Sequence, residues 1–127
     1  MSPVGEIRSY RDLKVWQESM SLVEGCYRFS NGFPKEELFG MTSQLRRAAV
    51  SVPANIAEGY GRESRGFYVT FLRTAQGSLK ELETHLILAQ RLKLGVNEVA
   101  EGLLSQCDSV GRMLRGLIRS VQRTAEQ

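Results

Sequence analysis

The sequence predicts an all-α protein, an antiparallel up-down-up-down four-helix bundle. Apolar residues recur at alternating steps of three and four in four segments, at about residues 12–30, 35–59, 64–94 and 97–124. Short connections join these segments, and helices with this spacing and such short loops pack as antiparallel neighbours. No segment shows the strict alternation of apolar and polar residues that is typical of a strand.

The first expected helix covers about residues 12–30. Asp12 is placed to cap its start, and the segment from Ser30 to Pro34 is typical of a helix end. Its proposed core row consists of Leu13, Trp16, Met20, Val23 and Tyr27.

The second expected helix covers about residues 35–59 and contains Pro53. Proline removes one backbone hydrogen bond and usually kinks a helix. The alternative is two helices broken near Ser51, but one kinked helix is favoured because its apolar row keeps its phase across the proline. That row consists of Met41, Leu45, Ala48, Val52 and Ile56.

A polar stripe accompanies the apolar row of this second helix. It is defined by Gln44, Arg47, Ser51, Asn55, Glu58 and Arg62, at steps of 3, 4, 4, 3 and 4. Small and apolar residues occupy much of the third side, whereas an ordinary surface helix has one apolar face and a broad charged one. We therefore expect this helix to be enclosed by neighbours, with the stripe at a subunit contact or lining a central opening; the sequence also leaves open that the stripe faces the bundle interior.

The last two helices show the most regular periodicity. Ser64 can cap the third helix, which ends near Gly95, and Asn97 can cap the fourth. The core row of the third consists of Tyr68, Leu72, Ala75, Leu79, Leu82, Leu86 and Ala89. The core row of the fourth consists of Val99, Leu103, Cys107, Val110, Leu114, Leu117 and Val121.

Composition limits the class of protein. A chain of 127 residues with 42% hydrophobic and 24% charged residues is typical of a single globular domain, residues 1–127. The N-terminus has no apolar signal core, and no run reaches the roughly 20 apolar residues of a membrane span. Cys26 and Cys107 are far apart and fit buried free thiols in a reducing compartment. We expect a cytoplasmic protein that does not contact membranes.

The charge pattern is compatible with a polyanionic partner. The net charge is +3, and residues 64–95 carry five Lys/Arg against two Asp/Glu. A mild excess of this kind permits contact with nucleic acid without requiring it. The nucleic-acid candidates are Arg46, Arg62, Arg65, Arg112, Arg115, Arg119 and Arg123.

Two of these arginines have a competing structural interpretation. Arg46 and Arg47 are adjacent and point about 100° apart on a helix, so they cannot serve one site in the same way. As functional residues they would contact phosphates, because guanidinium offers a planar fork. As structural residues they would pair with Glu58, Glu81 or Glu83, since an enclosed arginine is costly without a carboxylate.

Catalysis and cofactors are not predicted. His85 is the only histidine and follows Glu81 by four residues, but a metal site needs further ligands. We therefore expect no metal, no cofactor and no catalytic residue. Gly77 interrupts the third helix, where glycine is unfavourable. Either another backbone approaches it closely or the glycine is simply tolerated.

Several motifs in order resemble one protein family over about residues 10–95. They comprise Leu13, Trp16 and Gln17, then Phe33-Pro34, then Gln44 with Arg46 to Ala49, then Asn55, Glu58, Gly59, Gly61 and Arg62, then Gly77, Ser78, Glu81 and Glu83. Together they resemble the bacterial 23S rRNA-intervening sequence proteins. The resemblance implies a small four-helix bundle that forms homopentamers, has no established activity and is suggested to bind RNA.

Three functional hypotheses follow. The first is a non-enzymatic homo-oligomeric bundle, a pentamer by resemblance, that binds RNA or a ribonucleoprotein partner. The second is a protein interaction adaptor that does not bind nucleic acid. The third is an enzyme, which would require a cavity where Glu58, Glu81, Glu83 or His85 converge.

Overall fold

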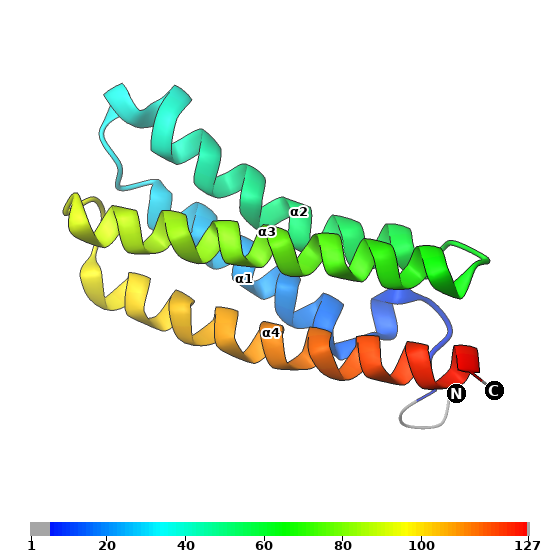
Figure 1. Cartoon of the computed structure of the whole chain (residues 1–127). Coiled ribbons are helices and arrows are strands. Elements are labelled where there is room, and N and C mark those ends of the chain that lie inside the picture. Colours follow the sequence, from blue (N-terminus) through cyan, green and yellow to red (C-terminus); the bar gives the residue numbers. More distant parts are fainter. Residues whose placement is uncertain (1–5, 127) are drawn as a thin grey trace.

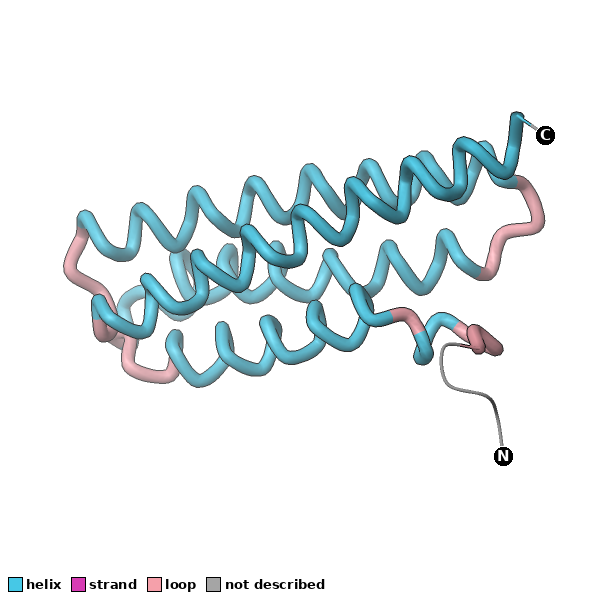
Figure 2. The backbone as a smooth tube through the Cα atoms, turned by 90° about the horizontal axis from the view of Figure 1, so that it is seen from below, coloured by secondary structure: helices cyan, strands magenta, loops and turns pink. Residues whose placement is uncertain are grey.

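The computed structural model describes residues 6–126, and its side chains up to residue 123. Four helices account for most of this part: α1 (Lys14–Ser30), α2 (Ser43–Tyr60), α3 (Arg65–Arg91) and α4 (Asn97–Glu126). No strand occurs among residues 6–126. In Figure 1 each helix runs back along the preceding one, and Figure 2 shows the connecting loops at the two ends of the bundle. The predicted all-α four-helix bundle is confirmed.

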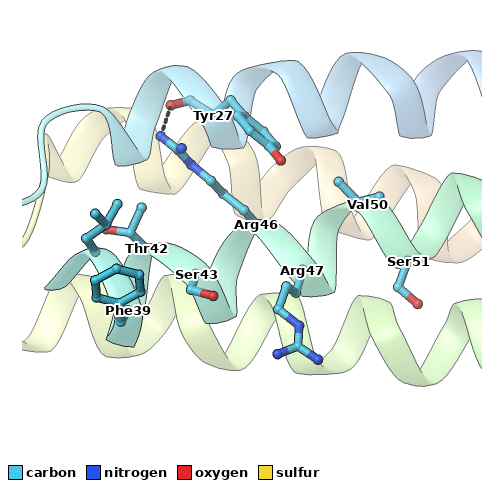
Figure 3. A pocket seen from close by; sticks show the side chains of 9 residues that line it. Tyr27, Phe39, Thr42, Ser43, Arg46, Arg47, Val50 and Ser51 are labelled. Atoms are coloured by element: carbon cyan, nitrogen blue, oxygen red, sulfur yellow. Dashed lines mark hydrogen bonds between the residues drawn. The ribbon is translucent and has the colours of Figure 1, made fainter.

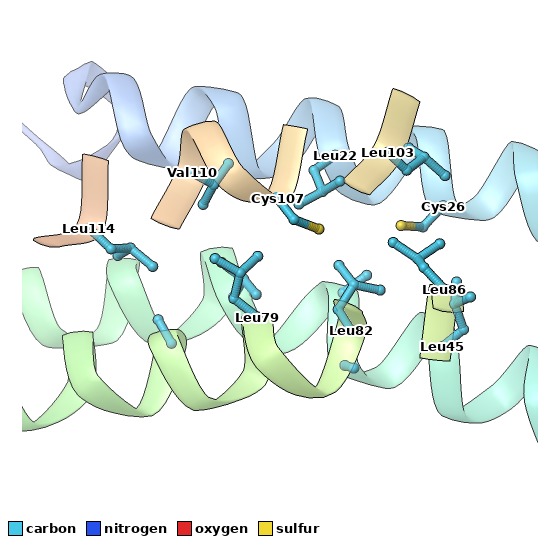
Figure 4. Packing of buried hydrophobic residues seen from close by; sticks show 14 of the residues in the cluster. Leu22, Cys26, Leu45, Leu79, Leu82, Leu86, Leu103, Cys107, Val110 and Leu114 are labelled. Atoms are coloured by element: carbon cyan, nitrogen blue, oxygen red, sulfur yellow. The ribbon is translucent and has the colours of Figure 1, made fainter. Parts of the chain in front are cut away.

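The helices enclose one core in the order α1, α2, α3, α4. Helix α2 packs against α1 and α3, and α4 packs against α3 and α1. Figure 4 shows leucines of α3 pointing toward side chains of α1 and α4. Buried members of the predicted α3 row are Leu72, Ala75, Leu79, Leu82, Leu86 and Ala89. The regular spacing on α3 therefore identified its core face correctly.

The core row predicted for the first helix is correct only in part. Leu13 is buried, and Trp16 and Val23 pack against the core, but Met20 and Tyr27 are 39% and 40% exposed. The buried row lies one position earlier and consists of Val15, Ser19, Leu22, Cys26 and Phe29. A serine inside this row hid it from the apolar pattern. The Ser19 hydroxyl donates to the carbonyl of Val15 at 2.6 Å, which satisfies its polar atom and allows it to be buried.

The core row of α4 needs two corrections. Leu103, Cys107, Val110 and Leu114 are buried as expected, but Val99 is 43% exposed and Ala100 is buried instead. Near the other end Leu117 is only partly buried, and Ile118, one position further along, is buried.

Helix α2 begins later than expected. A 3₁₀ turn, η2 (Lys35–Glu37), and a π-helical turn, η3 (Leu38–Thr42), precede it, and the backbone at Gly40 is not helical (φ −109°, ψ −110°). From Ser43 the helix continues through Pro53 to Tyr60, so the alternative of two helices broken near Ser51 is wrong. The kink at Pro53 stays a prediction.

The predicted caps are correct in part. Asp12 belongs to a turn before α1, η1 (Tyr10–Asp12), where it accepts hydrogen bonds from the backbone N–H groups of Arg8 and Ser9 at 2.9 and 3.2 Å. It therefore does not cap α1 itself. Ser64 does cap α3, because its hydroxyl accepts from the backbone N–H of Phe67 at 3.3 Å.

Candidate nucleic-acid interface

The polar stripe of α2 lies along the groove between α2 and α3. Its middle is half-buried and joins the helices, since the hydroxyl oxygens of Ser51 and Ser78 lie 2.7 Å apart. The Asn55 amide donates to the carbonyl and hydroxyl oxygens of Ser51 at 2.8 and 3.0 Å. This part of the stripe forms a contact between helices of one chain.

The ends of the stripe are exposed in the single chain. Gln44 and Arg47 are exposed and line, with Ser51, Ser78 and Glu81, a polar hollow of about 390 Å³. At the other end, Glu58 accepts a hydrogen bond from Arg62 at 3.0 Å. These two residues of the stripe thus form an exposed ion pair one turn apart, while a subunit contact or central opening at the stripe stays a prediction.

Arg46 is held by the end of α1. Its Nε donates to the Ser30 hydroxyl at 2.8 Å, and its Nη2 donates to the Asn31 amide oxygen at 2.9 Å and the Tyr27 carbonyl at 3.4 Å. Its guanidinium also lies 4.5 Å from the centre of the Tyr27 ring. The partners are therefore on α1 and are not the glutamates expected from sequence, so the geometry favours a structural role for this arginine.

Arg47 points away from its neighbour. In Figure 3 Arg46 extends toward α1, whereas Arg47 extends toward α3. This divergence follows from the angle of about 100° between successive helical residues. Among the side chains that the structure describes, none forms an ion pair or hydrogen bond with Arg47. Two adjacent arginines thus have opposite surroundings.

An apolar surface lies beside Arg46, on the α1–α2 side of the bundle. Its exposed members are Tyr27, Leu38, Phe39 and Val50, and Phe39 is 92% exposed. These four side chains line a hollow of about 630 Å³ together with polar residues of α2 and η3. This apolar surface, formed by α1, η3 and α2, is not covered within one chain.

The basic candidates from two distant segments lie in the same half of the bundle. The α2–α3 loop with Arg62, and the start of α3 with Arg65, are at the end where α4 finishes (Figure 1). This basic half is formed by residues 6–21, 52–78 and 110–126, which carry ten Lys/Arg and six Asp/Glu. The rest of the chain carries seven Lys/Arg and eight Asp/Glu.

The structure adds two basic residues that sequence analysis missed. Arg73 and Lys80 on α3 line a hollow of about 380 Å³ with Arg115 on α4, together with Gln76, Gly77, Leu79 and Gly111. Their spacing of seven residues, with a glycine between them, was the available signal, because residues seven apart share a helix face. We call this the α3–α4 hollow.

The remaining α4 arginines flank this hollow on the exposed surface. Arg112 donates to the Ser109 hydroxyl at 3.3 Å, and Arg119 and Arg123 are exposed. The nucleic-acid candidates of α4 thus form a row that continues beyond the hollow toward the end of the helix.

Gly77 of α3 is part of the same hollow. Apart from its chain neighbours and the nearby backbone of its own helix, no atom lies within 4 Å of the position that a Cβ of Gly77 would occupy. Close approach of another backbone is therefore not found within this chain, although the site is open to a group from outside.

The thiols and the histidine are enclosed. Burial raises the pKa of Cys26 and of Cys107 to about 12, and the neighbouring Cys26 further raises the pKa of Cys107. His85 is 15% exposed; its Nε2 lies 3.5 Å from Glu81 Oε1, and neither ring nitrogen has a hydrogen-bond partner within the described chain. In that same part of the chain, no three His, Cys, Asp or Glu residues are grouped as a metal site requires.

None of the described helices has the length and hydropathy needed to cross a membrane.

Comparison with known proteins identifies the family. No curated protein matches the chain. A solved structure from Bacteroides thetaiotaomicron VPI-5482, a protein of unknown function from the S23 ribosomal protein family, is similar with a TM-score of 0.76 and 24% identity. The match covers 83% of this chain and 95% of that one, and it shows the shared fold. Residues 11–116 match the family described as 23S rRNA-intervening sequence protein, and the chain therefore belongs to that family.

Proposed function

We propose that the protein is a non-enzymatic homo-oligomer that binds RNA, or a ribonucleoprotein partner, through the basic half of the bundle. The observation that carries the proposal is the convergence of Arg62 and Arg65 with the arginines of α4 at one end of the fold. This half also contains Arg73, and its excess of Lys/Arg is absent from the opposite half. A surface with this charge attracts phosphates without requiring a particular base sequence.

An exposed aromatic residue at the same end suits RNA bases. Phe67 is 61% exposed and follows Arg65 by two residues on α3. Exposed aromatic rings beside basic groups stack on unpaired bases. Tyr60 and Tyr68 instead pack edge to face, with ring centres 6.0 Å apart, and both lie against the core.

Self-association is supported by the apolar surface of α1, η3 and α2. A subunit contact at this surface would bury Phe39 and its exposed neighbours Leu38, Tyr27 and Val50 away from water. The number of five subunits rests on the family resemblance alone. Light scattering at micromolar concentration tests this part: an oligomer that Phe39→Glu weakens is expected, and only monomer in the unaltered protein would overturn it.

RNA binding is tested by charge reversal with a matched control. Arg62→Glu, Arg65→Glu and Arg119→Glu are combined, and Arg28→Glu, Arg47→Glu and Arg91→Glu give the same charge change in the other half. Fluorescence anisotropy with a labelled single-stranded RNA should show strong loss only in the first variant, with binding that weakens as salt rises. Absence of salt-sensitive binding by the unaltered protein at low ionic strength would refute the proposal.

A protein adaptor is the second candidate function. A groove of about 770 Å³ between α1 and α4 is lined by Phe29, Val96, Val99 and Leu103, and Gly102 leaves room in it. An apolar contact there would survive reversal of the basic half, whereas RNA binding would not.

A further inference from the structure

The two arginines of the α3–α4 hollow lack the kind of partner that Arg46 and Arg62 have. Arg62 pairs with Glu58, and Arg46 is bound by α1. By contrast, Arg73 and Arg115 form neither an ion pair nor a side-chain hydrogen bond with any of the side chains that the structure describes. Two guanidinium groups therefore line one hollow without a carboxylate between them.

The third cation has a partner on its own helix. Lys80 donates to both carboxylate oxygens of Glu83, one turn further along α3, at 3.1 and 3.4 Å. The Lys80 side chain is 72% exposed and that of Glu83 18%, so the ammonium group is on the solvent side of the pair and can turn toward a second anion. The hollow is therefore lined by three cationic side chains and by no carboxylate.

Glycine gives this hollow its depth. Gly77 lies between Arg73 and Lys80, and a Cβ there would meet no side chain and no backbone of another helix within 4 Å. On the opposite wall, Arg115 Nη1 lies 3.6 Å from the position that a Cβ of Gly111 would occupy. Packing within the chain does not require glycine at position 77, whereas a ligand that enters between the helices does need the space.

We infer that the α3–α4 hollow seats an internal phosphodiester of single-stranded RNA, an inference that rests on the proposed RNA binding. Arg73 and Arg115 donate to the non-bridging phosphate oxygens, for which a guanidinium fork is suited, and Lys80 adds a point charge. Arg112 and Arg119 flank Arg115 on α4 at steps of three and four residues, which suits a ligand with repeating anions. The flanking row favours a sugar-phosphate chain over an isolated anion.

The test fills the hollow without changing any charge. Gly77→Leu places a side chain in the hollow, and Gly102→Leu is the matched control, because Gly102 is also an exposed glycine inside a helix with no atom within 4 Å of its Cβ position. Full-length variants are compared by anisotropy with a labelled single-stranded RNA that has a 5′-hydroxyl end. Circular dichroism and light scattering verify that fold and assembly are unchanged. We expect Gly77→Leu to weaken binding at least ten-fold and Gly102→Leu to change it less than two-fold.

The outcomes separate this inference from the proposed function. If the unaltered protein binds RNA and Gly77→Leu binds equally well, the hollow is not the phosphate site, although RNA binding stands. If the unaltered protein does not bind, both fail. A 5′-monophosphate on the same RNA should leave the affinity unchanged. If the 5′-monophosphate tightens binding and Gly77→Leu abolishes this gain, the hollow binds a terminal phosphate and the assignment to an internal phosphodiester is overturned. If a poly-glutamate peptide competes as well as RNA, the assignment to phosphate is overturned.

Discussion

The two sides of α3 are built from different polar contacts. On the α2 side, Ser78 meets Ser51, and the stripe is satisfied where it is half-buried. On the α4 side, Arg73 and Arg115 line a hollow without carboxylate partners. The first side stabilises the fold, whereas the second leaves charge available to a ligand. Whether a basic residue is structural or available to a ligand therefore depends on the hydrogen-bond and ion-pair partners that the neighbouring helix provides.

The largest expected effect concerns a satisfied arginine. Arg46→Ala removes the hydrogen bonds to Ser30 and Asn31 and the contact with Tyr27. Because hydrogen bonds to charged groups are worth about 1.5–3 kcal/mol when partly buried, we expect a loss of about 2 kcal/mol in the free energy of unfolding. Urea unfolding measures it. Arg47→Ala, one position along, is the control and should cost less than about 0.5 kcal/mol.

Loss of Arg73 and Arg115 should reduce RNA affinity and leave the free energy of unfolding nearly unchanged. Arg73→Ala combined with Arg115→Ala should weaken RNA binding about ten-fold, or about 1.4 kcal/mol, while unfolding changes by less than about 0.5 kcal/mol. Anisotropy and urea unfolding of the same preparations measure both. A large loss of stability with unchanged affinity would reverse the assignment of the two sides.

Two buried thiols, one on α1 and one on α4, should make the free energy of unfolding depend on pH. Figure 4 shows the sulfur atoms of Cys26 and Cys107 facing each other in the core, and burial raises the pKa of both thiols from 9.0 to about 12. The neutral thiols favour the folded state, so their contribution is complete below pH 9 and is lost as the pH rises from 9 toward 12, at about 1 kcal/mol per pH unit for each thiol. Urea unfolding between pH 9 and 11 should therefore show a smaller slope in Cys107→Ala. An unchanged slope would mean that this thiol ionises as readily in the fold as in the unfolded chain.

The hydrogen bond between α2 and α3 has a smaller expected effect. Ser78→Ala leaves the half-buried Ser51 hydroxyl without its 2.7 Å partner on α3. We expect a loss of about 0.5–1 kcal/mol in the free energy of unfolding, because Asn55 still donates to Ser51. RNA affinity should stay the same, and a change in affinity would place this side of α3 in the interface.

The exposed pair at the end of the stripe gives the smallest effect. Glu58→Gln removes the charge that meets Arg62. A pair at this spacing is worth about 0.3–0.5 kcal/mol when exposed. Thermal unfolding should therefore shift little, and RNA affinity should rise slightly because Arg62 is released. Weaker RNA binding would indicate that Glu58 positions Arg62 for the ligand.

The sequence was sufficient for the fold where one side of a helix is wholly apolar. The row from Leu72 to Ala89 on α3 shows this, and the Ser64 cap also followed from local chemistry. The phase of α1 failed because Ser19 satisfies its hydroxyl within its own helix, which a count of apolar residues does not reveal. Periodicity likewise did not show that η3 and Gly40 delay the start of α2.

The candidate site was less predictable, because partners on other helices decide it. The row of arginines on α4 was visible in the sequence, but Arg73 and Lys80 join it only when α3 is placed beside α4. In the sequence Arg46 could not be distinguished from an arginine that contacts phosphate, yet it donates hydrogen bonds to Ser30 and Asn31 at the end of α1. Such information lies in the packing of helices and is absent from the periodicity of any one of them.

The most direct test compares the salt dependence of RNA binding in Arg115→Ala and Arg46→Ala. Each phosphate contact to a single strand contributes about 0.7 to the slope of log affinity against log salt. The slope should fall by about that amount in Arg115→Ala and stay unchanged in Arg46→Ala, measured where both variants are folded. Equal slopes for Arg115→Ala and the unaltered protein, or a reduced slope in Arg46→Ala alone, would contradict the distinction between a ligand-binding and a structural arginine.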